Sequence, residues 1–212
     1  MLDSFDSRAL RLTDCYGQRF MKAGAYRYHV VPVGVDCLVE ERPFVVNVVQ
    51  RKAKGDMAQH DVVVRAEHAA FRVEPTEVSI EVGDLVLWHC PDAKAMPYMV
   101  VGEKEFFGSH RLLNESGYTH AFGFPGEYRW RDAYGSAVGG VVRVRDPGCR
   151  NQQDVLKWRH SLGSAALVMI SDEKAQPPEV DIVTGQTVFF AVAKARGISV
   201  TDERALGRPG KR

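Results

Sequence analysis

Apolar residues alternate with polar ones along most of this chain, and a period of two is typical of half-buried β-strands. The strand-like runs are short, rich in β-branched and aromatic residues, and bounded by glycine, proline or charged residues. Clear examples are residues 45–48, 62–64, 78–82, 86–88, 166–170 and 188–192. Many short strands at such spacing predict an all-β protein built as a sandwich or barrel.

One stretch departs from this period. Val155, Trp158 and Leu162 are spaced by three and four residues, which places them on one face of a short helix over residues 151–162. The regions expected outside the strand-rich units are the connectors 51–65 and 147–163 and a tail, 207–212, predicted to be disordered.

The chain also contains an internal repeat, which bears on the fold before any single motif does. Its distinctive residues recur without a gap 102 positions downstream. The matched pairs include Phe5 and Phe107, Ser7 and Ser109, Tyr16 and Tyr118, Phe20 and Phe122, Tyr26 and Tyr128, Ile80 and Ile182, and Gly83 and Gly185. Two similar units are therefore expected.

The order of the repeated segments is informative. A Gly-x-Tyr-Arg-aromatic segment and a Glu-Val-x-Ile segment alternate twice along the chain. We predict an intact unit over residues 66–146 and a split unit made from residues 1–50 and 164–206. Half a unit of strands has unpaired edges, so the split unit must close within one chain or by domain swapping with a second copy.

The middle of the chain resembles the cupredoxins. The residues that carry this resemblance are the run 71–75, the Gly83-Asp84 turn before the apolar strand ending at Trp88, residues 97–102, and the Pro-Gly-Glu-Tyr turn at 125–128. The resemblance implies two Greek-key β-sandwiches packed as a pseudo-symmetric pair, one of them assembled from the N- and C-terminal segments.

Cupredoxins hold copper with two histidines, a cysteine and often a methionine, a ligand set that suits a blue-copper centre. In this chain the first His position falls near Tyr98, the Cys position on Trp130 and the second His position on Ala133, with no Met following in that loop. The terminal halves offer Tyr28 and Val31 at the corresponding places. The resemblance thus implies a cupredoxin-like protein that has lost its copper site, with no cofactor.

Two other sites stay open. An unconventional metal site, with copper as the cofactor, would draw on His89, Cys90, His110, His120 and Asp132. His89 and Cys90 are adjacent, and neighbouring strand residues point to opposite faces, so they seldom bind one ion. His120 shares its strand parity with inward-facing aromatic residues, which favours a hydrogen-bonded core histidine.

A pocket between the two units is the other site, because domain interfaces favour small-molecule pockets. Its expected lining is Tyr98, Trp130 and Tyr134.

Composition adds few constraints. A net charge of +1 gives no electrostatic reason to expect nucleic acid or membrane as a partner. The start of the chain lacks the basic and apolar pattern of a leader, and no apolar run is long enough for a membrane span, so a cytoplasmic location is expected. The four cysteines show no metal-ligand spacing and are expected to be reduced.

Three functional hypotheses follow from these patterns. The first is a cupredoxin-like binding or assembly module whose partner is a protein or a second copy. The second is a copper-dependent redox protein or enzyme. The third is a small-molecule enzyme or binder. We favour the first, which requires no enzymatic activity.

Overall fold

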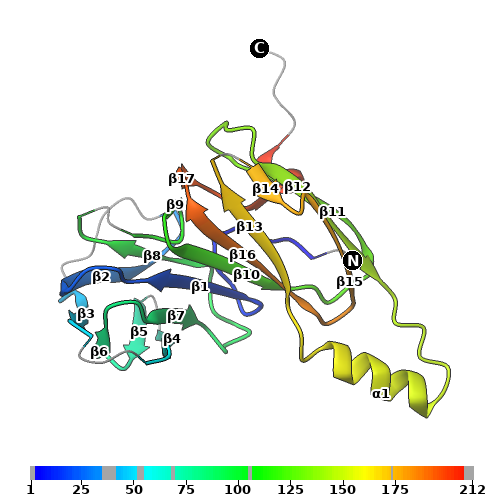
Figure 1. The fold of residues 1–212 in the computed structure, drawn as a ribbon, viewed down its shortest axis with the longest axis horizontal. Helices are drawn as coiled ribbons and strands as arrows, with labels where there is room; N and C mark the ends of the chain where they lie inside the picture. The colour runs from blue at the N-terminus through cyan, green and yellow to red at the C-terminus, as the bar shows by residue number, and fades with distance from the viewer. Residues whose placement is uncertain are drawn as a thin grey trace.

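The computed structural model of this chain describes residues 3–34, 42–51, 55–67, 70–104, 107–172 and 174–207. Strands dominate these residues, with one α-helix and one short 3-10 helix among them. The predicted all-β class is therefore confirmed. Figure 1 shows two strand-rich units side by side, with the helix extending away from the second unit.

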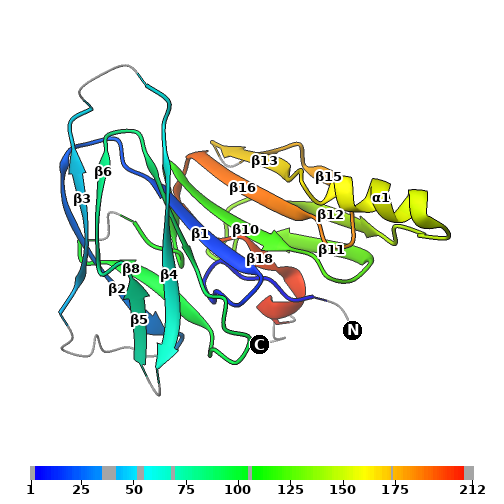
Figure 2. The ribbon, with the colours of Figure 1, turned by 90° about the horizontal axis from the view of Figure 1, so that it is seen from below.

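The first unit spans residues 14–102. Its strands are β1 (Asp14–Arg19), β2 (Gly24–Pro32), β3 (Phe44–Val49), β4 (Gln59–Glu67), β5 (Ala70–Glu74), β6 (Glu77–Glu81), β7 (Leu85–His89) and β8 (Tyr98–Gly102). Four of them are neighbours in the order β5-β4-β7-β1, and the other four form a separate sheet in the order β6-β3-β2-β8. Figure 2 shows these two layers facing each other.

The second unit, residues 116–202, repeats this plan. Its strands are β10 (Ser116–Ala121), β11 (Gly126–Arg131), β12 (Gly139–Arg145), β13 (Ala166–Ser171), β14 (Lys174–Gln176), β15 (Glu179–Val183), β16 (Thr187–Lys194), β17 (Arg196–Ile198) and β18 (Thr201–Asp202). β14-β13-β16-β10 form one layer and β15-β12-β11-β18 the other. β17 pairs with β9 (Leu112–Leu113), which lies between the two units in sequence.

The two units share one eight-stranded sheet, in which β1 and β10 are antiparallel neighbours. Tyr16 lies directly opposite its repeat counterpart Tyr118. The next strands follow the same rule, because Trp88 lies opposite Tyr16 and Phe190 lies opposite Tyr118. A pseudo-twofold axis therefore passes between the two tyrosines and relates the units.

Large aromatic side chains fill the space between the layers of each unit. In the first unit the Trp88 ring lies 5.4 Å from that of Tyr16 and 5.3 Å from that of Tyr28. In the second unit the Trp130 and Phe190 rings are 5.1 Å apart. Burial raises the pKa of Tyr28 to about 12, as expected for a phenol in an apolar core.

The strand pairing corrects the predicted division of the chain. β3 pairs in parallel with β6, so residues 44–49 share a sheet with residues 77–81. β12 pairs with β15 in the same way, which joins 139–145 to 179–183. Each unit is thus largely contiguous, in place of an intact unit over 66–146 and a split unit from 1–50 and 164–206.

The chain ends do meet, although through a smaller segment than predicted. We call residues 3–13 the first arm and residues 107–115, their repeat counterpart, the second arm. The Ser7 amide donates to Val200 O at 3.0 Å, and the Ser109 amide donates to Val100 O at the same distance. The first arm therefore completes the second unit, and the second arm completes the first.

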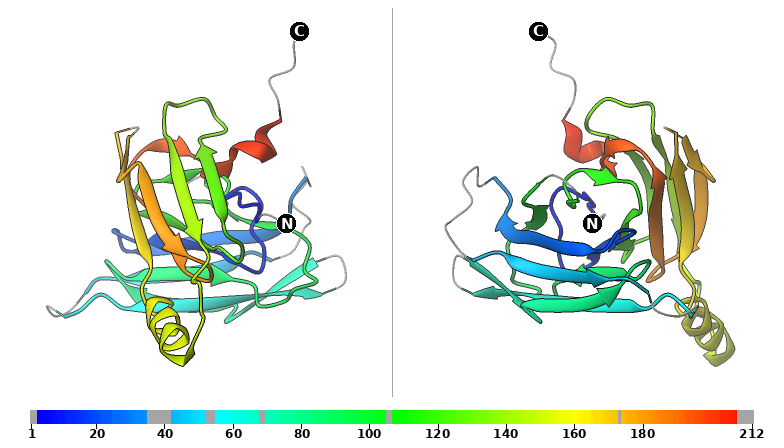
Figure 3. Two further views of the ribbon diagram at one scale, coloured as in Figure 1. Left: turned by 90° about the vertical axis from the view of Figure 1, so that its right-hand side faces the viewer. Right: turned by 60° about the vertical axis from the view of Figure 1, so that its left-hand side comes forward.

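Each arm also crosses to the other unit. The Leu10 amide of the first arm donates to Tyr98 O at 2.8 Å, and Leu112 of the second arm pairs with Ile198. Figure 3 shows the first arm, in dark blue, close to strands of both units. The arms thereby fasten the two units to each other beyond their shared sheet.

The predicted helix forms as α1 (Gln152–Ser161), and Asn151 caps it by accepting from the Asp154 amide at 3.0 Å. Trp158 Nε1 donates to Thr184 O at 2.7 Å, which attaches the helix to the second unit. With ten residues, α1 cannot cross a bilayer, and no other described helix can.

The last described element is the 3-10 helix η1 (Glu203–Leu206). Of the tail predicted to be disordered, residues 207–212, the structure describes only Gly207, so the rest of that prediction lies outside the described residues.

The predicted connector 51–65 is partly wrong, because its last residues belong to β4, an inner strand of the eight-stranded sheet. Val62 and Val64 are fully buried, whereas Asp61 and Arg65 face solvent. The strand-like run at residues 62–64 was visible in the sequence, but it was placed in the connector and not in a unit.

Candidate functional site

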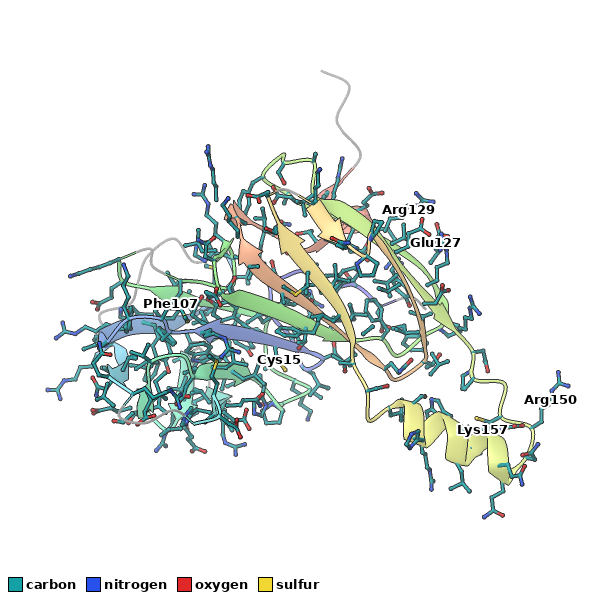
Figure 4. The ribbon with its side chains drawn as sticks, viewed as in Figure 1. Cys15, Phe107, Glu127, Arg129, Arg150 and Lys157 are labelled. Carbon is teal, nitrogen blue, oxygen red and sulfur yellow. The ribbon has the colours of Figure 1, made fainter. Side chains whose placement is uncertain are left out.

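The predicted metal ligands His89 and Cys90 lie on different faces of the fold. His89 ends β7 and lies opposite Cys15 of β1, which is labelled in Figure 4. Cys90 is buried, and this burial raises the pKa of its thiol. A thiol is a metal ligand only as a thiolate, so burial works against that role.

The carboxylate of Asp132 binds backbone amides of the loop that follows β11 and of residue Ser199. It accepts hydrogen bonds from the Ser199 amide at 2.8 Å and from the Tyr134 and Ser136 amides at 3.1 Å. Burial opposes ionisation of Asp132, but these amides outweigh it and hold the pKa of the carboxyl below its usual value. Asp132 therefore has a structural role, which is to hold the loop after β11 in place.

His120 lies in the core at the junction of the units. Its Nδ1 is 2.7 Å from Asp14 Oδ1, and the Tyr118 hydroxyl donates to the same oxygen at 2.6 Å. The Phe5 and Phe122 rings lie 5.3 Å and 4.6 Å from the imidazole. The structure thus places His120 as a hydrogen-bonded core residue.

The five metal candidates do not come together. Within the described ranges no three His, Cys, Asp or Glu side chains form a group that could hold an ion. One of the five, His110, belongs to a different kind of site, because it lies in the second arm and lines a pocket.

The predicted pocket residues are also separated. Tyr98 and Trp130 are buried in different units, where their rings pack against Phe71 and Phe190. Tyr134 is half exposed, and its hydroxyl donates to His110 O at 2.7 Å. Of the three, only Tyr134 lies beside the second arm.

A pocket of about 380 Å³ does lie where the two units meet. It is lined by β8, the second arm and β17, through residues Val101, Gly102, Phe107, Gly108, His110, Arg111, Leu113 and Arg196. Gly102, Phe107 and Gly108 are buried and form its floor, whereas Arg111 and Arg196 are exposed at its rim. Phe107 is labelled in Figure 4.

Two glycines shape this floor. A Cβ on Gly102 would lie 2.9 Å from Phe107 O, and a Cβ on Gly108 would lie 2.8 Å from His110 Cε1. Any larger residue would have to displace these neighbours. The close packing of the second arm against β8 therefore requires glycine at both positions.

Arg111 is held in place on two sides. Its stem passes over Gly197, where φ is +97° and an added Cβ would lie 2.5 Å from Arg111 Nε. Its guanidinium carbon lies 5.7 Å from the centre of the Tyr134 ring, within the range of a cation–π contact. Gly197 and Tyr134 therefore fix the position of one rim cation.

Sequence reasoning found His110 and Tyr134 near this pocket but missed the two arginines and the glycines. The change from Asp6 to Gly108 lies at the repeat offset of 102 and could have been read from the sequence. The change from Asp202 to Gly102 lies at an offset of 100, which an ungapped alignment does not register. Comparison of the chain with protein families, curated proteins and solved structures finds no match.

Proposed function

We propose that this protein is a cupredoxin-like binding module without a blue-copper centre, and that the pocket between its units is its ligand-binding site. The observation that carries this proposal is the joint origin of the pocket, since β8 of the first unit, the second arm and β17 of the second unit all line it. Junctions between domains are common locations for small-molecule sites.

The size and chemistry of the pocket support a binding role. Its volume of about 380 Å³ lies within the range of small-molecule sites. The floor supplies the Phe107 ring and backbone groups, and the rim supplies two guanidinium groups. These groups orient a ligand, and among the described lining residues no Ser, Cys, Asp or Glu side chain accompanies His110, so binding is the function they support best.

The test is a fragment screen on the full chain by ligand-observed NMR, repeated on two variants. Leu113→Trp fills the pocket mouth, whereas Leu167→Trp adds the same bulk at an exposed position on β13. We expect fragments that bind the unmodified chain to lose binding to the Leu113 variant and to keep it with the Leu167 variant. Fragments that ignore the Leu113 change would contradict the proposal.

A further inference from the structure

The pocket has a structural counterpart in the second unit, which can be located from the backbone. The Gly102 amide donates to Phe107 O at 3.0 Å, and the Asp202 amide donates to Phe5 O at 2.9 Å. Phe5 and Phe107 are repeat counterparts, so Asp202 occupies the position that Gly102 has beside the pocket.

Gly108 has an acidic counterpart too. Gly108 forms a β-bridge with Val101, and Asp6 forms the equivalent bridge with Thr201. In the second unit, Asp6 holds the Arg8 guanidinium through contacts of 2.9 and 2.8 Å. This hydrogen bond raises the pKa of Arg8.

Asp202 holds a second cation in the same region, because Arg204 Nε lies 2.9 Å from Asp202 Oδ1. The second unit therefore neutralises two arginines with two carboxylates of its own. In the first unit both carboxylate positions are glycines, and both line the pocket.

The cations at the pocket rim have no such partner. Among the described residues, neither Arg111 nor Arg196 forms an ion pair within 4.0 Å. Their counterparts across the pseudo-twofold axis are the uncharged Ala9 and Met96. Arginine at these two positions is thus specific to the pocket side of the molecule.

The described acids close by are engaged elsewhere. Asp172, in the adjoining hollow that also reaches Arg196, pairs with Lys194 at 2.8 Å. Glu103, one residue beyond β8, lies 3.5 Å from His29 of β2. Among the described residues, the two rim guanidinium groups are thus the charged groups at the pocket mouth, and an anion is the ligand that complements them.

We infer that the pocket binds a small organic anion whose phosphate or carboxylate group pairs with Arg111 and Arg196. Guanidinium groups bind both kinds of oxyanion through two parallel hydrogen bonds. The negative charge of the ligand lies beside the two glycines that replace Asp6 and Asp202, and a compact ring next to that charge contacts Phe107. This inference rests on the proposed function and names the ligand class of the same pocket.

The experiment titrates the full, isotope-labelled chain with phenyl phosphate and benzoate at millimolar concentration, and with benzyl alcohol as the neutral control. We expect both anions to shift the amide signals of Gly102, Phe107, Gly108 and Leu113, and benzyl alcohol to leave them unchanged. Arg111→Ala and Arg196→Ala should each weaken binding by about tenfold, because each removes a charged hydrogen-bonding partner. Arg27→Ala removes an exposed charge on β2 and should have no effect.

Three results would overturn the inference. The first is that neither anion shifts the amide signals of the pocket residues. The second is that both anions shift amide signals elsewhere in the protein. The third is that the arginine variants bind the anions as well as the unmodified chain does. Equal binding of benzyl alcohol at the pocket, unchanged in the arginine variants, refutes the anion preference and leaves the pocket as a binding site. No response of the pocket amides to these probes or to the fragment library refutes both proposals. A stronger response to phenyl phosphate than to benzoate identifies phosphate as the preferred group.

Discussion

Asp84 and its counterpart Gln186 show how one residue position can serve the same purpose with different chemistry. Asp84 Oδ2 accepts from the Glu81 amide at 3.0 Å, and Gln186 Oε1 accepts from the Val183 amide at 2.8 Å. Each side chain then reaches the connector of its own unit. Asp84 accepts from the Ala58 amide, and Gln186 donates to Ser161 O at 2.8 Å.

Replacing Asp84 by Asn should destabilise the protein at neutral pH. Burial opposes ionisation of Asp84, but hydrogen bonds from the Ala58 and Glu81 amides, His60 and Arg51 outweigh it and hold its pKa well below the ordinary value. A cost of about 1–3 kcal/mol is expected for removing this buried charged acceptor. Urea unfolding at pH 7 measures it.

The same substitution has a defined pH dependence. A carboxyl with a depressed pKa in the folded state stabilises the fold fully above its unfolded pKa of about 4, and this contribution is lost as pH falls. The free-energy difference between Asp84→Asn and the unmodified chain should therefore shrink below about pH 4. Asp61→Asn, an exposed neighbour on β4, is the control. A difference that grows in acid would contradict this account.

The buried Asp14 and His120 pair is a second prediction at this scale. Asp14→Ala removes the partner of both His120 and the Tyr118 hydroxyl, which should cost about 3 kcal/mol in unfolding free energy. Ser116 is the repeat counterpart of Asp14 and makes a single side-chain hydrogen bond, to Leu113 O at 2.6 Å. Ser116→Ala should cost about 1 kcal/mol, and equal costs for the two variants would count against a special role for the pair.

At the scale of elements, the exchanged arms dominate the architecture. Phe5 of the first arm packs among Phe122, Tyr128 and Phe190 of the second unit, with ring distances of 5.3, 6.4 and 6.3 Å. Phe107 of the second arm packs against Trp88 of the first unit at 5.8 Å. Each aromatic ring therefore belongs to the core of one particular unit.

Truncating these rings should loosen the two units selectively. Phe5→Ala and Phe107→Ala are each expected to cost about 3–5 kcal/mol, the usual range for a buried Phe. Amide hydrogen exchange should accelerate in β11 and β16 for the first variant and in β2 and β7 for the second. Phe124→Ala, at an exposed position, is the control. Faster exchange in the opposite unit would show that the arms are assigned to the wrong cores.

The elements also show what the sequence could and could not predict. The strand runs, the helix at residues 152–161 and the repeat follow from local pattern, and the structure contains them. The strand that pairs with β3 does not follow from local pattern. Residues 77–80 and 179–182 carry nearly the same motif, and both offer a suitable strand edge. Only the chain length between partners and the packing of the arms decide between them.

At the scale of the whole molecule, the chain contains a partner for each of its repeat segments. Both arms dock within the same chain, and β1 pairs with β10 across the pseudo-twofold axis. The assembly that a single unit would reach by pairing with a copy is already achieved inside one polypeptide. The pocket is likewise a whole-molecule feature, because the residues that form it come from distant segments of the sequence and two of them are glycines.

We therefore expect the protein to be a monomer at micromolar concentration. Light scattering coupled to size exclusion should give the mass of one chain. A variant lacking residues 1–10 leaves its second unit incomplete and should self-associate in the same measurement. A stable dimer of the full chain would contradict intramolecular docking of the first arm.

The exchange of arms has a consequence for biosynthesis. The second arm leaves the ribosome directly after the unit that it completes, so the first unit can close early. The first arm precedes both units in the sequence, whereas its docking site on β18 is the last strand that the structure describes. A nascent chain thus carries Phe5 unburied until β18 has been made, and crowded polysomes are where arms of neighbouring molecules meet the wrong acceptor.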